Sequence, residues 1–316
     1  MVKLPAGKTL TAVSIAFAAL AMIGYLVVRE TAAKPQGLGE SIFGDKAAGS
    51  KSAGKYYLLS REFDAPVEYP TAIAIGPDNR VYIGGEGQLA VCDMFGSAKD
   101  LIELEDTPYA IAVDNSGLVY AGLTKSVVVI DPFRGSIDTW SELDESAIIT
   151  SVAVSTDEVL VADAGNRVVL RYDLFGKLLG RIDARFVIPS PYFDVAFDPA
   201  GDAWIADTGR HTLAGFDASG AKLDSWGRPG LDANGFGGCC NPIHFVIPSD
   251  GGFITSEKGL QRIKVLDAEG RHVSTVAGPR DLGGGAEGLD LAIDKDDTLL
   301  VLLAWSRKIL VFERNI

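Results

Sequence analysis

The chain has 316 residues, of which 47% are apolar, with 36 glycines, 14 prolines and a formal net charge of −13. This length and composition suit one large all-β domain with many turns, whereas the negative charge repels phosphate backbones and excludes nucleic acid as an expected partner. Three cysteines, Cys92, Cys239 and Cys240, are too few for a disulfide-rich scaffold.

Residues 9–28 contain no charged side chain. Twenty such residues in a helix rise about 30 Å, the thickness of the hydrocarbon core of a bilayer, so residues 1–31 are predicted to be a short cytoplasmic stub and a transmembrane helix. A cleaved signal peptide is the alternative, although its apolar region is usually only about 7–15 residues long. Both interpretations place the rest of the chain on the periplasmic or extracellular side.

Residues 32–55 are rich in Gly, Ala, Ser and Lys and show neither helical nor strand periodicity. This composition predicts a flexible linker between the membrane and the following domain.

From residue 56 to residue 316 the sequence repeats one unit six times. Each unit has an apolar inner strand followed by a turn and a second apolar strand, and the inner strands are centred on Ile73, Ile111, Val152, Val195, Phe245 and Leu291, which are 38 to 50 residues apart. Such periods, with about four short strands each, are typical of propeller blades. The sequence therefore predicts an all-β, six-bladed β-propeller over residues 56–316.

The sixth unit ends after its third strand, at residues 309–312. An unassigned strand, residues 56–63, precedes the first unit. We expect this strand to complete blade six, because that arrangement joins the chain ends and removes an open sheet edge.

Four short sequence segments resemble the NHL repeat family: the run from Ala162 to Val169, the run from Trp226 to Gly230, and the pairs Gly235-Phe236 and Asn241-Pro242. The resemblance covers residues 56–316 and implies a six-bladed propeller. NHL propellers include protein- and RNA-binding modules, sensor domains of membrane kinases and a peptide-amidating lyase, and related propellers include lactonases and esterases. The resemblance thus implies a fold and leaves the function open.

One column of residues lies at the start of the inner strands, where ligands usually bind in such propellers. It runs Ala72, Ala110, Ser151, Asp194, His244, Asp290. Two residues later, small side chains recur (Ala74, Ala112, Ala153, Ala196 and Ala292), which is expected beside a crowded axis. Asp194, His244 and Asp290 could together hold one divalent metal ion or act as acid and base. The alternative is that they satisfy backbone groups at the strand starts.

The longest connection between blades contains Cys239 and Cys240. Long loops often carry binding sites, and adjacent cysteines can form a disulfide, bind a soft metal or react as thiols. The alternative is a small buried pair in a tight turn, and Cys92 alone is expected in the core.

A second set of charged residues follows the second strands. It comprises Asp163, Asp207 and Glu257 with Arg167, Arg210 and Arg262, and it is expected on the same face as the column. These residues could bind a ligand, or the acids could accept hydrogen bonds from turn amides while the arginines pair with them.

No complete catalytic motif is present: there is no Gly-x-Ser-x-Gly, no His-Glu-x-x-His and no phosphate-binding loop. The resemblance implies amidating lyases, which bind metal through several histidines. This chain has only three histidines, and only His244 among them lies at the start of an inner strand. We therefore expect a membrane-anchored module that binds a protein or small ligand on its top face, the face where the inner strands begin. The alternative is a metal-dependent hydrolase, lactonase or lyase that uses Asp194, His244 and Asp290.

Overall fold

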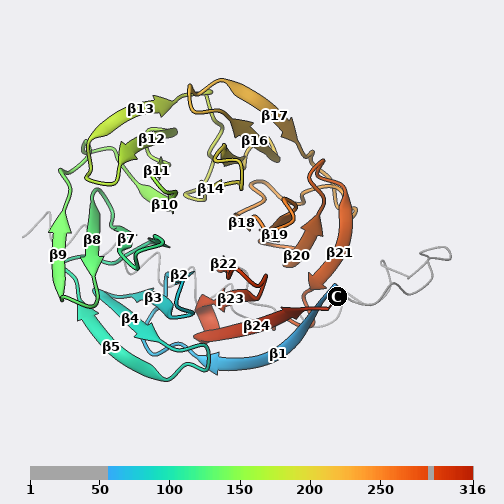
Figure 1. The fold of residues 1–316 in the computed structure, drawn as a ribbon. Helices are drawn as coiled ribbons and strands as arrows, with labels where there is room; N and C mark the ends of the chain where they lie inside the picture. The colour runs from blue at the N-terminus through green and yellow to red at the C-terminus, as the bar shows by residue number, and fades with distance from the viewer. Residues whose placement is uncertain (1–55, 284–287, 316) are drawn as a thin grey trace, which may run out of the picture. The chain divides into compact units, whose positions relative to one another are not determined.

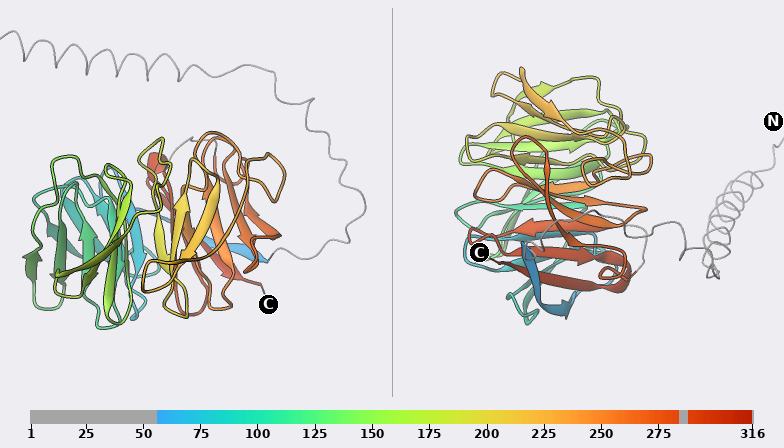
Figure 2. Two further views of the ribbon diagram at one scale, coloured as in Figure 1. Left: turned by 90° about the horizontal axis from the view of Figure 1, so that it is seen from above. Right: turned by 90° about the vertical axis from the view of Figure 1, so that its right-hand side faces the viewer.

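The structure is a computed structural model that describes residues 56–283 and 288–315. Its strands form six four-stranded antiparallel sheets around a central opening (Figure 1). Seen from the side, the loops of the blades gather at two opposite faces (Figure 2). The predicted six-bladed β-propeller is confirmed, whereas the expected anchor at residues 9–28 and linker at residues 32–55 lie outside the described residues.

In blades one to five the first strand in sequence lies at the axis and the last lies at the rim. Blades one to three consist of β2 (Ala72–Ile75), β3 (Val81–Gly85), β4 (Gln88–Cys92) and β5 (Ala98–Glu103); β6 (Ala110–Val113), β7 (Val119–Gly122), β8 (Val127–Asp131) and β9 (Ser136–Thr139); and β10 (Ile149–Val154), β11 (Glu158–Asp163), β12 (Val168–Asp173) and β13 (Leu178–Ile182).

Blades four and five repeat this order. They consist of β14 (Val195–Phe197), β15 (Ala203–Asp207), β16 (Thr212–Phe216) and β17 (Lys222–Trp226); and β18 (His244–Val246), β19 (Phe253–Glu257), β20 (Arg262–Leu266) and β21 (His272–Ala277).

Blade six is built from both ends of the propeller. It contains β22 (Leu289–Ile293), β23 (Leu299–Leu303), β24 (Lys308–Arg314) and, at the rim, β1 (Tyr57–Asp64), with a short 3-10 turn at Ala304–Ser306. Strand β1 pairs antiparallel with β24, so that Leu59 lies opposite Phe312 and Phe63 opposite Ile309. This pairing confirms the predicted closure. Within the described ranges no helix is long and apolar enough to cross a bilayer.

The turns between third and fourth strands show how the sequence sets the fold. In four blades an aspartate Oδ1 accepts hydrogen bonds from the backbone N–H groups two and four residues later, as Asp173 does from Phe175 and Lys177. This is the Asx turn that favours Asp at such positions. Gly176 completes the turn with a φ of +83°, and a Cβ there would lie 2.7 Å from the Trp140 ring. Both the positive φ and the close approach of the Trp140 ring therefore require a glycine.

The core lies between the blades. In the described residues the buried hydrophobic side chains form six clusters, one at each junction of two neighbouring blades. Cys92 is part of the cluster between blades six and one, as predicted. Because no single sheet covers its own faces, each blade depends on both neighbours, and the inner strands are held at fixed positions around the axis.

Candidate functional site

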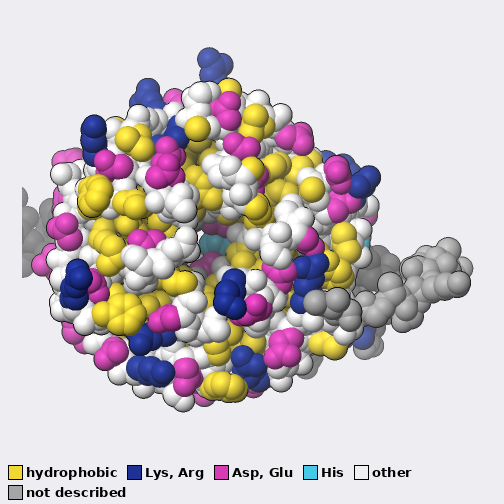
Figure 3. Space-filling model, viewed as in Figure 1, with side chains coloured by type: hydrophobic (Ala, Val, Ile, Leu, Met, Phe, Trp, Pro, Cys, Tyr) yellow, Lys and Arg dark blue, Asp and Glu magenta, His cyan; other side chains and the backbone are white. Residues whose placement is uncertain are grey.

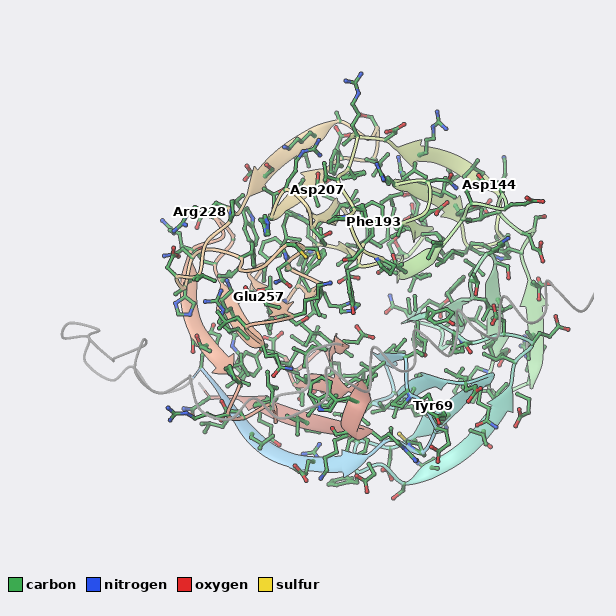
Figure 4. The ribbon with its side chains drawn as sticks, turned by 180° about the vertical axis from the view of Figure 1, so that it is seen from behind. Tyr69, Asp144, Phe193, Asp207, Arg228 and Glu257 are labelled. Carbon is green, nitrogen blue, oxygen red and sulfur yellow. The ribbon has the colours of Figure 1, made fainter. Side chains whose placement is uncertain are left out.

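The axial opening forms a cavity of about 270 Å³ lined by the inner strands of all six blades. The small residues Ala74, Ala112, Ala153, Ala196 and Ala292 line it, as expected for positions beside the axis. Figure 3 looks into this opening and shows histidine and acidic atoms within it. Figure 4 places Phe193, the neighbour of Asp194, near the opening.

Asp194, His244 and Asp290 come together in this cavity, from blades four, five and six. The Nδ1 atom of His244 lies 3.4 Å from Oδ1 of Asp290 and 3.7 Å from Oδ2 of Asp194. The three side chains expose 18%, 19% and 10% of their surface for His244, Asp290 and Asp194, respectively. The juxtaposition predicted from the column of strand starts is therefore present.

Both carboxylates also bind the backbone. Asp290 Oδ2 accepts a hydrogen bond of 2.9 Å from the N–H of Ile73 in blade one, and Asp194 Oδ2 accepts one of 2.7 Å from Phe245 in blade five. Ser151, at the same column position in blade three, accepts one of 3.2 Å from Val195 in blade four. The column thus links each of these blades to the next, which is the structural role considered as the alternative.

The electrostatics of the cavity favour a charged imidazole. Burial alone would lower the pKa of His244, but the neighbouring Asp290 carboxylate and the hydrogen bond with Asp194 outweigh it and raise that pKa to about 9. Burial raises the pKa of Asp290, and the Asp194 charge adds to this effect, whereas His244 and the N–H groups of Ile73 and Leu291 oppose it. A pKa of about 9 favours the imidazolium form of His244 at neutral pH.

Across the described residues, no group of three or more His, Cys, Asp or Glu side chains is arranged to hold a metal ion. The divalent metal expected at Asp194, His244 and Asp290 therefore stays a prediction.

The second predicted set of charged residues lies around the mouth of the propeller rather than in the cavity. Each acid accepts a hydrogen bond of 3.0 Å from the N–H of a residue in the preceding loop: Asp163 from Ile148, Asp207 from Val187 and Glu257 from Gly237. Asp207 and Glu257 lie in neighbouring blades (Figure 4). These acids hold in place the loops that lead into the inner strands. This agrees with the second alternative above, in which the acids accept hydrogen bonds from backbone amides.

The arginines of this set differ from one another. Arg210 pairs with Asp207, and Arg262 Nη2 lies 2.9 Å from Glu257 Oε2. Arg167 instead is exposed, in a left-handed turn position with φ +57°, and it is Asn166 Nδ2 that donates to Asp163 Oδ2, at 2.8 Å. The expected pairing is confirmed for two of the three arginines.

Sequence reasoning missed Lys264, which is 1% exposed and belongs to the Glu257 cluster. Its Nζ lies 3.0 Å from Glu257 Oε1, donates to the Gly235 carbonyl at 2.8 Å and lies 4.3 Å from the centre of the Phe236 ring. Burial lowers the pKa of Lys264, although Glu257 opposes this. A lysine within the third strand, at a position facing the core, was the signal available in the sequence.

The cysteine pair lies beside the mouth of the cavity. Lys258 Nζ lies 4.3 Å from the centre of the Tyr192 ring, and the edge of that ring faces His244 with 6.1 Å between ring centroids. Hydrogen bonding from Lys258 also reaches the Cys240 thiol. Lys258 thus contacts both Cys240 and the Tyr192 ring, which packs against His244, and so connects the cysteine pair with the axial cavity.

Comparison with known proteins agrees on the fold. No family model and no curated protein matches the chain, so the NHL assignment is not confirmed. Among solved structures, a streptogramin B lyase is similar at a TM-score of 0.56 and 13% identity, over 82% of this chain and 98% of that chain. A protein of unknown function from Bacteroides thetaiotaomicron is similar at a TM-score of 0.61 and 16% identity, over 81% and 72%.

A third similar structure is virginiamycin B lyase from Staphylococcus aureus, a catalytically inactive histidine-to-alanine variant with quinupristin, at a TM-score of 0.56 and 14% identity, over 78% of this chain and 80% of that chain. Identities this low establish the propeller fold and no more.

Proposed function

We propose that this protein is a binding module whose axial cavity holds one small polar ligand at Asp194, His244 and Asp290. The observation that carries the proposal is the placement of three partly exposed ionisable side chains from three blades in one cavity of about 270 Å³. This volume lies close to the range of small-molecule sites, and a few convergent polar groups in a preformed pocket are typical of them.

The charges of the site favour a ligand with a positive group. Two carboxylates face one imidazolium, which leaves an excess of negative charge when both acids are ionised, and the whole chain adds to it with its net charge of −13. The aliphatic side chains of Ile73, Ile111 and Ile293 also line the cavity. A protonated amine with a short aliphatic body matches this lining.

Three probes of one shape test this preference: n-butylammonium, butan-1-ol and butyrate. Histidine NMR signals report on binding, because the chain has three histidines and a His244→Gln variant assigns the relevant one. We expect saturable shifts of the His244 signals with butylammonium, weaker shifts with butanol and none with butyrate. Equal responses to all three probes, or butylammonium binding that survives in Asp290→Asn together with Asp194→Asn, would contradict the proposal.

The proposal includes the cellular setting expected from the sequence: an NHL-type propeller tethered to a membrane through residues 9–28 and facing the periplasm or the extracellular space. The uncharged run of twenty residues supports it. Extraction of cell membranes at alkaline pH tests it, because an anchored chain stays in the pellet, and deletion of residues 9–28 is expected to release it. A full-length chain recovered in the wash would contradict the tether.

An enzymatic function is the second candidate, because two of the similar structures are lyases and His244 lies against two carboxylates, as an acid–base pair requires. Incubation with quinupristin, followed by chromatographic separation and fragmentation mass spectrometry of any converted product, tests a lyase directly, and metal analysis tests the metal-dependent form. Product formation that is lost in His244→Ala, or stoichiometric metal lost in the same variant, would favour the enzyme over the binding module.

A further inference from the structure

Cys239 and Cys240 form a cluster that the axial cavity does not include. Cys239 is exposed, whereas Cys240 is buried, with 1% of its surface accessible. Their Sγ atoms are in contact, 2.9 Å apart, and no bond joins them in the structure. One exposed and one buried sulfur in contact differ from two buried thiols that only fill a turn.

The loop that carries the pair is fixed on both sides. On one side, Gly237 N–H donates to Glu257 Oε2 at 3.0 Å. On the other, Asn241 is 1% exposed, its Oδ1 accepts a 2.9 Å hydrogen bond from Lys258 N–H, and its Nδ2 donates 2.5 Å and 3.1 Å bonds to the carbonyls of Gly237 and Lys258. The position of the sulfurs is thus set by Glu257 at the end of strand β19 and by Lys258 directly after it, rather than by the loop alone.

The surroundings of Cys240 stabilise a thiolate. Burial raises the pKa of Cys240, but hydrogen bonds with Cys239, Ser190 and Lys258 outweigh it and lower that pKa overall. The Lys258 Nζ lies 3.2 Å from Ser190 Oγ, and both side chains hydrogen-bond with the Cys240 thiol. The hydrogen bond to Cys240 raises the pKa of Cys239. The thiolate is therefore favoured on Cys240, and the contact between the two sulfurs allows a proton to pass from Cys239 to Cys240.

We propose that Cys239 and Cys240 are a thiol–disulfide exchange site whose substrate is a small-molecule disulfide. The Cys239 sulfur passes its proton to Cys240 and attacks one sulfur of the reagent; the reagent's S–S bond breaks and one thiolate leaves, which yields a mixed disulfide on Cys239. The thiol proton of Cys240 is then lost to the departing thiolate. Cys240 attacks Cys239 Sγ and expels the second thiolate, so that the pair loses two electrons and the reagent becomes two thiols.

The roles follow from exposure. A reagent reaches Cys239 at the surface, whereas Cys240 is accessible only to its neighbour, so Cys239 forms the mixed disulfide and Cys240 resolves it. The Cα atoms of adjacent residues lie about 3.8 Å apart, shorter than the about 4.4–6.8 Å of ordinary disulfides, so the closed ring is strained and easily reduced. The site therefore cycles between its two states instead of serving as a permanent crosslink.

Oxidised glutathione is the probe for this site. The purified full chain is reduced, freed of reductant and incubated with oxidised glutathione, and its intact mass is followed over time. We expect the loss of two hydrogen atoms with little accumulation of a mixed disulfide, and full return on addition of reduced glutathione. A Cys92→Ala control is expected to behave identically, because Cys92 is buried and burial raises its pKa to about 12.

Two variants separate the roles. Cys240→Ser is expected to stop at one glutathione per chain, on the exposed Cys239, and Cys239→Ser is expected to react at least about tenfold more slowly than the wild type. Circular dichroism confirms that each variant is folded. Phenylarsine oxide, which bridges two adjacent thiols, gives an independent measurement on the wild type: one equivalent is expected to bind and to block oxidation.

Lys258→Met tests the electrostatic contribution, and we expect the mixed disulfide to resolve about tenfold more slowly in this variant, because the Cys240 thiolate loses its cation. The proposal would be overturned if the wild-type chain retained both thiols after incubation with oxidised glutathione and did not bind phenylarsine oxide. Two glutathiones per chain would also overturn it, because that result shows that the sulfurs react independently. These outcomes concern the cysteines alone and are separate from ligand binding in the axial cavity.

Discussion

The His244 imidazole lies 3.4 Å, from Nδ1 to Oδ1, from the Asp290 carboxylate, across the boundary between blades five and six. The same carboxylate accepts the N–H of Ile73 in blade one. A single acidic side chain therefore contacts three inner strands, and the charge of the cavity and the closure of the propeller depend on the same atoms.

The first prediction concerns pH. The pKa of His244 rises from an ordinary 6.5 to about 9 in the folded protein, so its contribution to stability is fully present below pH 6.5 and is lost as the pH rises through 9. We expect the free energy of unfolding to fall by roughly 3 kcal/mol over this window. Urea unfolding at several pH values measures it, and His244→Gln is expected to lose this part of the pH dependence.

NMR titration of the same protein supplies an internal contrast. Burial and the nearby Lys264 and Arg262 lower the pKa of His272, whereas that of His244 is raised. The two imidazoles are therefore expected to titrate on opposite sides of pH 6.5. A His244 signal that titrates at or below pH 6.5 would refute the proposed ion pairing.

The second prediction concerns the link between blades six and one. Asp290→Asn keeps the shape of the side chain but removes its charge, so the hydrogen bonds from Ile73 and Leu291 weaken and His244 loses its nearest carboxylate. We expect the protein to lose about 1–3 kcal/mol of stability and the pKa of His244 to fall. Asp296→Asn, whose side chain is 65% exposed, is the control and is expected to change stability by less than about 0.5 kcal/mol.

The third prediction concerns the Glu257 cluster. Glu257→Ala leaves the buried Lys264 and Arg262 without their carboxylate and frees the Gly237 N–H. Removal of one partner from a buried ion pair costs about 3–5 kcal/mol, so we expect a loss of that size in chemical unfolding. Limited proteolysis is expected to cleave within residues 227–243. Glu269→Ala, at a 66% exposed side chain, is the matched control, and equal losses in both variants would contradict the structural role.

The fourth prediction concerns the strand that closes the propeller. Tyr57 is 1% exposed and packs in the cluster between blades five and six, whereas its neighbour Leu58 is 46% exposed. Tyr57→Ala is expected to cost about 3–5 kcal/mol and Leu58→Ala less than about 1 kcal/mol, as measured by thermal or urea unfolding. Similar values for the two variants would mean that β1 is not seated on blade six.

Much of the fold was predictable because propeller blades are local. The strands at Val168–Asp173 and His272–Ala277 follow from alternation and turn residues within a few positions, and the missing fourth strand of blade six identified β1 as its partner. The approach of Asp194 to His244 was also predictable, because equivalent positions of successive inner strands converge at the axis.

The roles of the charged residues around the mouth were less predictable. Glu257 binds Gly237, which lies 20 residues earlier, and Asp207 binds Val187 across a similar separation. A repeat pattern places these acids on a face but does not say which distant amide each one meets. Arg167 illustrates the limit: the position equivalent to Arg210 is occupied by Asn166, which donates to Asp163, and Arg167 lies one residue further along the turn.

The pairing of β1 with β24 also has a mechanical consequence. Tyr57 lies opposite Arg314, and the Asn315 N–H donates to the Tyr56 carbonyl at 2.9 Å, so the two ends of the propeller leave from the same corner of blade six. A pull on the residues that precede Tyr56 acts first on this corner and peels β1 away one residue pair at a time. Tension on the N-terminal side of the chain would thus separate β1 from β24 and open the propeller at blade six before it disturbs any other blade.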